Sequence, residues 1–294
     1  MSRKSLFILA TLLISSLTFA QHRPTEGKSF VPAMSEAQNT AAGIAQKNMV
    51  AGVSPAVATS NCSWTFTSPQ TAANKYLQFC VTVNGNIVEF QSPSGVEYIR
   101  VGAYSEGYGV CDVSSGVHYY DYADSGDSGN WLAPIVQAVT ATSVKIARTT
   151  SDGVWTLTQT IAINKAAASA NVTMALKNNT AVGRAAAIIR FADIDVGGSF
   201  DNNFDGTYDS AWGYNRISGS TTPYYGLLLQ LNGPSSFSHE GFAINTPVGP
   251  DPCNSAASWI GTLTGVDGGV VYWQYLGTVG KSATKTVKEK YTAF

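Results

Sequence analysis

Apolar and polar residues alternate over most of the chain, and this alternation limits the possible folds more than any other sequence feature. Residues 76–83 alternate and run into Asn84-Gly85, and residues 86–90 then continue the apolar pattern. Asn-Gly between two such runs predicts a β-hairpin, because both turn residues tolerate a positive φ. The period of two therefore indicates strands and argues against helices.

Two longer runs indicate that one face of a sheet is buried. Trp155, Leu157 and Ile161 share one side of a strand with threonines on the other, and residues 172–176 repeat the pattern. Further strands are predicted at 98–104, 116–122, 143–149, 186–192, 225–231, 237–243, 269–276 and 284–291. No segment past residue 60 has a helical period. We therefore predict an all-β fold, an antiparallel two-sheet β-sandwich of roughly a dozen strands.

The start of the chain has the pattern of a secretory signal peptide. Arg3-Lys4 precedes a largely apolar run over residues 6–17, and the small residue Ala20 fits a cleavage site. The run is shorter than the ~20 residues that a membrane-spanning helix needs. We expect residues 1–20 to be removed, which predicts a secreted or periplasmic protein without a membrane span in the mature chain.

The remaining chain divides into a leader and one domain. Residues 21–58 are rich in Ala, Ser, Thr and Pro, have little periodicity, and are predicted to be flexible, with a short helix over 36–49 as an alternative. Residues 59–294 show no repeat or change of composition, so they are predicted to form a single domain.

Export allows disulfide bonds, and four cysteines are present: Cys62, Cys80, Cys111 and Cys253. An even number favours two bridges, although three pairings are possible. We favour Cys62–Cys80, because both residues fall in adjacent predicted strands, which leaves Cys111–Cys253.

Residues 193–209 carry five aspartates, and Asp201-x-Asn203-x-Asp205-Gly206 matches the first half of a calcium-loop pattern. In a tightly wound loop, alternate side chains converge on a hard cation, which takes six to eight oxygen ligands. The stretch resembles the calcium loop of EF-hand and dockerin-like proteins, but Trp212 stands where those loops have a glutamate.

Carboxylates outside the loop would then have to complete the calcium shell, and alternate residues of the preceding strand are the nearest candidates. The predicted Ca²⁺ ligands are Asp193, Asp195, Asp201, Asn203, Asp205, Thr207 and Asp209. The alternative is a loop of Asx turns with solvated carboxylates. The aspartates at 121, 124 and 127 form a second acidic group, either another cation site or a solubilising loop.

Aromatic residues in or beside loops, with Asp and Asn nearby, are typical of sugar-binding surfaces. The candidate ligand-binding rings are Tyr120, Tyr122, Trp131, Trp212, Tyr214 and Tyr224. Packing within the sheets is the alternative for each of them.

These features give three hypotheses for function, and fold alone does not choose between them. The first is an exported, calcium-stabilised binding or structural module that binds a glycan or a cell-surface polymer. The second is a secreted carbohydrate-active hydrolase, which would need two facing carboxylates. The third is a surface adhesion or assembly component. The formal net charge of −1 excludes a strongly basic nucleic-acid binder.

Overall fold

The computed structural model describes residues 61–71, 75–99, 105–217, 224–254 and 262–294. The predicted signal peptide and leader lie outside these residues, as does most of the strand predicted over 98–104. Helix within the described ranges is confined to two 3₁₀ turns, η1 (Ala123–Ser125) and η2 (Val196–Gly198). No helix in this part of the chain could cross a membrane.

Seventeen described strands form three antiparallel sheets, in the orders β1-β2-β3, β14-β16-β10-β4-β5 and β15-β11-β12-β13-β17-β9-β8-β7-β6. The strands before residue 140 are β1 (Trp64–Ser68), β2 (Leu77–Val81), β3 (Ile87–Gln91), β4 (Glu106–Asp112), β5 (Val117–Asp121) and β6 (Ile135–Val139). The next six are β7 (Ser143–Thr149), β8 (Trp155–Asn164), β9 (Ser169–Asn178), β10 (Arg184–Asp193), β11 (Asn202–Thr207) and β12 (Ser210–Asn215). The last five are β13 (Tyr225–Leu231), β14 (Ser238–Ile244), β15 (Leu263–Val266), β16 (Gly269–Val279) and β17 (Thr284–Ala293).

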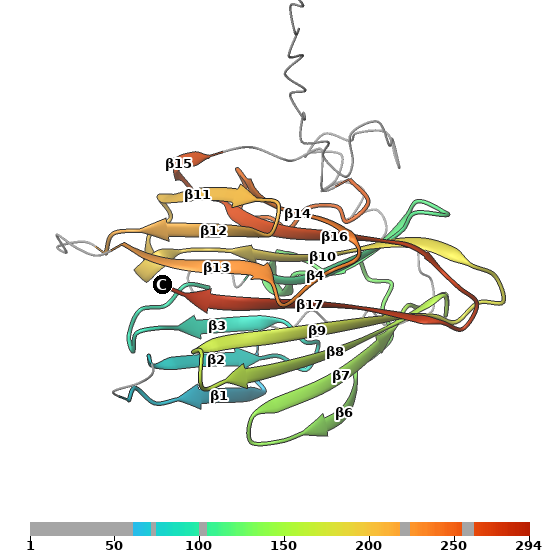
Figure 1. Cartoon of the computed structure of the whole chain (residues 1–294), viewed down its shortest axis with the longest axis horizontal. Helices are drawn as coiled ribbons and strands as arrows, with labels where there is room; N and C mark the ends of the chain where they lie inside the picture. Colours follow the sequence, from blue (N-terminus) through green and yellow to red (C-terminus); the bar gives the residue numbers. More distant parts are fainter. Residues whose placement is uncertain (1–60, 72–74, 100–104, 218–223, 255–261) are drawn as a thin grey trace, which may run out of the picture.

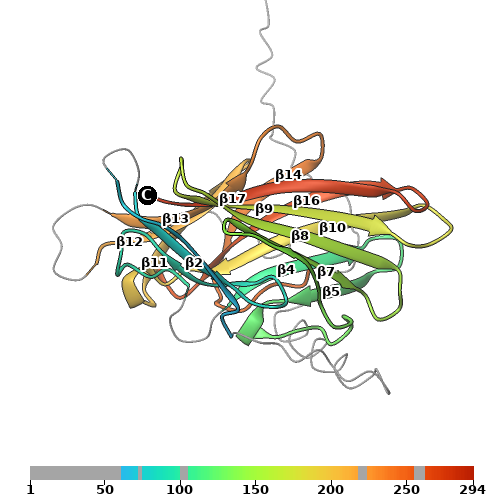
Figure 2. The ribbon, with the colours of Figure 1, turned by 90° about the horizontal axis from the view of Figure 1, so that it is seen from below.

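The predicted fold class is confirmed, because the sheets pack as a sandwich (Figures 1 and 2). Figure 1 shows the nine-stranded sheet curving from β15 at the top to β6 at the bottom. Contacts from β8 and β17 to the other sheets cross the core: Arg190 of β10 donates to Gln159 of β8, and the Phe90 and Tyr291 rings lie 6.1 Å apart. The main core therefore lies between the nine-stranded sheet and the two smaller ones.

Strands with regular alternation lie where the sequence predicts them. β7 has the predicted bounds, and alternate residues of β8 are buried throughout its length. The Asn84-Gly85 hairpin joins β2 to β3, and Gly85 has the positive φ (92°) that such a turn requires. Strand β4 is a further strand beyond those predicted, because Gly107 and Gly109 interrupt its apolar pattern. Gly107 is needed there, since a Cβ would lie 1.8 Å from the Asp121 carbonyl oxygen.

Both predicted disulfides are present. Cys62–Cys80 joins the start of the domain to β2, and Cys111–Cys253 joins β4 to the segment that follows β14. The second bridge spans 142 residues of sequence. In the chain-entropy account, the longer closed loop restricts the unfolded chain more.

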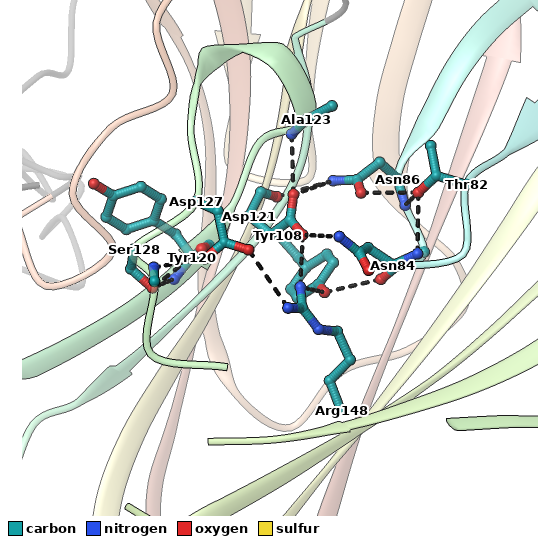
Figure 3. A network of polar contacts seen from close by, with 12 residues as sticks. Thr82, Asn84, Asn86, Tyr108, Tyr120, Asp121, Ala123, Asp127, Ser128 and Arg148 are labelled. Atoms are coloured by element: carbon teal, nitrogen blue, oxygen red, sulfur yellow. Dashed lines mark hydrogen bonds and ion pairs between the residues drawn. The ribbon is translucent and has the colours of Figure 1, made fainter. Parts of the chain in front are cut away.

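A buried arginine neutralises the acidic group around residue 121 (Figure 3). Arg148 from β7 forms an ion pair with Asp121 and a second, longer one of 3.4 Å with Asp127, and all three side chains are at most 3% exposed. Its Nη1 also donates to the Tyr108 hydroxyl at 3.0 Å. The sequence suggested a second cation site at these aspartates as one possibility. In the structure Arg148 takes the place of such a cation at Asp121 and Asp127. Asp124 is exposed.

Candidate functional site

The segment that matches the calcium-loop pattern forms a β-hairpin. Residues 202–207 are strand β11, and Thr207 pairs with Ser210 across a two-residue turn. Phe204 is completely buried in the core, so the stretch alternates like the other strands. Because a strand rises about 3.3 Å per residue, same-face side chains lie in a row and do not wrap around one point.

Gly206 supports close packing in this hairpin and not a sharp turn. A Cβ at this position would lie 2.6 Å from the Gly241 carbonyl oxygen and 2.7 Å from the Phe242 Cα. Glycine therefore lets β11 pack closely on β14, a role that the loop pattern does not indicate.

The polar residues of the hairpin bond to separate partners. Asn203 Nδ2 donates to the Tyr214 carbonyl at 3.4 Å, and Asp205 Oδ2 accepts from the Thr262 hydroxyl at 3.1 Å. The Thr207 hydroxyl is hydrogen-bonded to the Ser210 hydroxyl at 2.8 Å, and Asp209 Oδ1 lies 2.9 Å from His239 Nε2. Asp201 is exposed just before the hairpin. These five predicted calcium ligands therefore do not converge on one point, because those in the hairpin bond to different partners.

Asp193 and Asp195 do come together, and Asp267 joins them. Asp193 ends β10 and pairs with Gly269, the first residue of β16, so Asp267 in the preceding turn lies beside it. One carboxylate oxygen from each of the three lies within 4.8 Å of the others. The sequence analysis missed Asp267, because only the β10–β16 pairing brings it to residues 193–195.

The loop after β10 is held in place by its own amides. Asp195 N–H donates to the Tyr98 carbonyl at 2.8 Å, and Asn202 Oδ1 accepts from Val196 N–H at 3.3 Å. Asn202 Nδ2 also donates to Asp195 Oδ1 at 3.4 Å. These bonds fix the position of the Asp195 carboxylate relative to Asp193.

The three carboxylates are electrostatically unfavourable to one another. Asp193 is 5% exposed, and its Oδ1 has no hydrogen-bond partner among the described residues. Burial, then the charges of Asp195 and Asp267, raise the pKa of Asp193 to about 9. Burial and the Asp267 charge raise the pKa of Asp195 to about 7. A cation at this point would offset the repulsion, and carboxylate oxygens are ligands for hard metal ions.

The predicted ligand-binding rings separate into buried and accessible groups. Tyr122 and Trp131 are completely buried, and Tyr120 stacks on Tyr122 with ring centroids 5.1 Å apart. These rings pack within the protein, so buried Tyr122 and Trp131 offer no face to a ligand. Trp212 and Tyr214 are partly exposed on the same side of β12, and Tyr224 is 46% exposed just before β13.

Tyr224 borders a pocket of about 370 Å³ at the end of the sandwich marked C in Figure 1. Four segments meet here: the approach to β2, the turn after β3, the start of β13 and the end of β17. The pocket is lined by Gln70, Lys75, Tyr76, Ser92, Pro93, Tyr224, Tyr225, Ala293 and Phe294. Four of these side chains are aromatic, and three of the four rings come from positions that the sequence analysis did not select.

Packing around the pocket positions its rings. Gly226 leaves room for Phe294, whose Cζ would lie 2.2 Å from a Cβ at that position. Tyr214 meets Tyr224 edge to face at 5.5 Å. The Tyr76 hydroxyl donates to Gln78 Oε1 at 2.9 Å, and Ser92 Oγ donates to the Tyr76 carbonyl at 2.6 Å. The result is an apolar wall with a few polar groups, the usual composition of a small-molecule site.

No protein-family model and no curated protein sequence matches this chain. A solved structure of a bacterial glucoamylase complexed with acarbose aligns with a TM-score of 0.50 and 10% identity, covering 80% of this chain and 32% of that chain. The present chain therefore shares its fold with about a third of that protein.

Two further solved structures align more loosely. A galactose mutarotase-like protein from Clostridium acetobutylicum has a TM-score of 0.43 and 7% identity, over 79% of this chain and 99% of that one. An aldose epimerase homologue from C. elegans has a TM-score of 0.42 and 9% identity, over the same 79% and 99%.

Proposed function

We propose that this protein is an exported glycan-binding β-sandwich module stabilised by calcium. The pocket walled by Tyr76, Tyr224, Tyr225 and Phe294 is the observation that carries the proposal. Aromatic rings pack against the C–H faces of sugars, while hydroxyl, amide and amine groups bind sugar hydroxyls. Gln70 and Lys75 supply such polar groups at the same pocket.

The pocket volume favours a short ligand segment. At about 370 Å³ the pocket lies near the lower end of the ~300–1,000 Å³ typical of small-molecule sites. One or two sugar rings fit this size better than a long polymer lying in a groove. The module would therefore bind the end of a glycan or a short branch.

Export is the second part of the proposal. Both disulfides are of the kind that persists in oxidising compartments, and the described residues contain no helix able to cross a membrane. The signal-peptide pattern of residues 1–20 agrees with this.

Calcium binding is the third part, at Asp193, Asp195 and Asp267. The orphan Oδ1 of buried Asp193 supports it independently of the carboxylate grouping, since a buried acceptor without a donor costs about 1–3 kcal/mol. Ca²⁺ suits an all-oxygen site with water in its remaining positions, and extracellular modules bind it with Kd values of roughly 10⁻⁴–10⁻³ M.

Binding of a glycan is tested by calorimetry with the disulfide-bonded protein and a panel of neutral and acidic disaccharides. Tyr224→Ala removes one wall of the pocket, and we expect about a tenfold loss of affinity. Tyr208→Ala is the matched control, because Tyr208 is 49% exposed but belongs to the β11–β12 turn. Absence of binding at millimolar sugar, or equal loss in both variants, would refute the glycan site. Release of new reducing ends from a polysaccharide would favour the hydrolase alternative.

Calcium binding is tested by thermal unfolding in EDTA and in calcium chloride. At a calcium concentration 100 times Kd, ligand binding adds about 2.7 kcal/mol to the free energy of unfolding, which raises Tm by several degrees. Asp193→Asn should remove this response and change Tm in EDTA little at neutral pH, where a pKa of about 9 already keeps Asp193 protonated. An unchanged Tm on adding calcium to the wild type would contradict the proposal.

A further inference from the structure

The one charged side chain among the described residues that line the aromatic pocket is positive. It belongs to Lys75, and none of the lining residues has a carboxylate side chain. The chain as a whole has 18 basic and 19 acidic residues, so this local excess does not follow from composition. A pocket of this sign favours anionic ligands over neutral ones.

The Lys75 ammonium is available to a ligand. Its side chain is exposed and makes no ion pair with any residue in the described ranges. The Glu89 carboxylate accepts hydrogen bonds from Gln78 Nε2 at 2.8 Å and from Gln91 Nε2 at 3.0 Å. Gln78 in turn accepts from Tyr76, which lines the pocket, so Gln78 stands between Glu89 and the pocket wall.

A second cation contacts Tyr224, one of the rings of this pocket. The Arg216 guanidinium lies over the Tyr224 ring, with Cζ 4.5 Å from the ring centroid. Arg216 is exposed, and within the described part of the chain this cation–π contact is the sole interaction of its guanidinium. Stacking on the ring orients the guanidinium while leaving its N–H donors free for a carboxylate or sulfate.

We infer that the ligand of this pocket is an acidic sugar, which places its ring against the tyrosines and its carboxylate or sulfate group between Lys75 and Arg216. This inference rests on the proposed glycan-binding function and names the chemical class of its ligand. Charge-assisted hydrogen bonds to two cations are stronger than hydrogen bonds to a neutral hydroxyl. Two cations are too few for a nucleic-acid surface, which needs an extended basic stripe.

The test compares three disaccharides that differ only in their anionic group: galactobiose, digalacturonate and a sulfated galactobiose. Calorimetry is run at low and high sodium chloride with the same calcium concentration throughout. We expect at least one acidic disaccharide to bind about tenfold more tightly than galactobiose, and this preference to shrink with salt. The uronate and sulfate arms show which anion the pocket prefers.

Variants assign the preference to the two cations. Lys75→Met and Arg216→Met should each lose about fivefold in affinity for the preferred acidic sugar, and the loss for galactobiose should be smaller in both variants. Lys75→Arg should keep most of the affinity, and Lys165→Met, at an exposed turn residue after β8, is the matched control. Equal affinities for the neutral and acidic sugars would overturn the inference while leaving the glycan site intact. Absence of binding by all three sugars would refute the glycan site as well.

Discussion

Two groups of aspartates in this molecule are removed from water, and they differ in what lies beside them. Asp121 and Asp127 surround Arg148, and Asp121 also accepts hydrogen bonds from Asn84 and Asn86 (Figure 3). Asp193 and Asp195 have a third aspartate nearby and no basic side chain in ion-pair contact in the described ranges. The first group is paired with an arginine of the protein, whereas the second has no such partner among the described residues.

The difference shows where an external ion is needed. A buried carboxylate is stable when it is paired and hydrogen-bonded, protonated, or bound to a metal. Arg148 pairs with the buried carboxylates of the first group and donates hydrogen bonds to them. Burial lowers the pKa of Arg148, but Tyr108, Asp121 and Asp127 together raise it by more, so the guanidinium stays charged. The cluster at Asp193 has the carboxylates of a cation site and no basic side chain in ion-pair contact among the described residues, so a proton or a cation must offset its charge. The contrast gives the calcium proposal its physical basis.

Glu289, like Asp193, is a buried carboxyl group whose raised pKa favours protonation. It is fully buried in β17, its Oε1 accepts from Gln274 Nε2 at 2.9 Å, and its Oε2 has no partner among the described residues. Burial raises its pKa to about 8, against the lowering effects of Gln274 and Arg190. The group therefore carries a proton at neutral pH.

Removing the arginine from the first group should have the largest effect. Arg148→Met leaves two buried carboxylates without a counter-charge, and we expect the free energy of unfolding to fall by roughly 3–5 kcal/mol in urea titrations. Arg184→Met is the control, since Arg184 is 21% exposed and its partner Asp112 also accepts from Trp155 Nε1. A loss for Arg148→Met no larger than that of the control would show that the two groups do not differ as described.

Glu289→Gln should have an intermediate effect that depends on pH. Because the pKa is raised from about 4.5 to about 8, the folded protein keeps a proton that the unfolded chain loses between these values. Stability from this group is therefore fully present below pH 4.5 and declines as pH rises to about 8. The variant lacks this decline, so we expect it to gain stability over the wild type at pH 8.5, by on the order of 1–3 kcal/mol, and not at pH 4.5.

The check is chemical denaturation at several pH values, with Lys288→Gln on an exposed face of the same strand as control. If the free energy of unfolding changed with pH in the same way for the wild type and for Glu289→Gln, Glu289 would be ionised in the folded protein. That result would contradict the protonated state described above.

The smallest effect is expected at the hairpin. Asp205 belongs to β11 and bonds to Thr262, so Asp205→Asn should leave the calcium-induced rise in Tm unchanged within about 1 °C. Asp193→Asn provides the comparison under the same conditions. Loss of the calcium response in Asp205→Asn would mean that β11 unpairs and winds around the ion, as the loop pattern predicts.

The sequence was informative where alternation is regular. β8 and the Asn84-Gly85 hairpin could be predicted because each position shows its face directly. β11 could not, since Asp, Asn and Gly dominate its composition and resemble a turn, while Phe204 alone indicates the buried face. The composition of residues 202–207 indicates a turn, whereas the alternation around Phe204 indicates a strand. The segment is a strand because it pairs with β12.

The candidate sites show the same limit over longer distances. Asp193 and Asp195 were identified because they are two residues apart, whereas Asp267 reaches them only through sheet pairing. At the pocket, Tyr224 was identified from its loop position, but Tyr76 and Phe294 come from segments far away in sequence. Residues that are distant in the sequence and brought together only by the fold cannot be recognised from the local pattern of a single sequence.

The Cys111–Cys253 bridge has a consequence for the fate of the protein after proteolytic cleavage. A single cut of the backbone anywhere between these two cysteines produces two pieces that remain covalently joined. The exposed turns of β7 through β13 all lie within this interval. A nicked molecule would therefore migrate as one species until a reductant is added, and its sheets could stay assembled after damage.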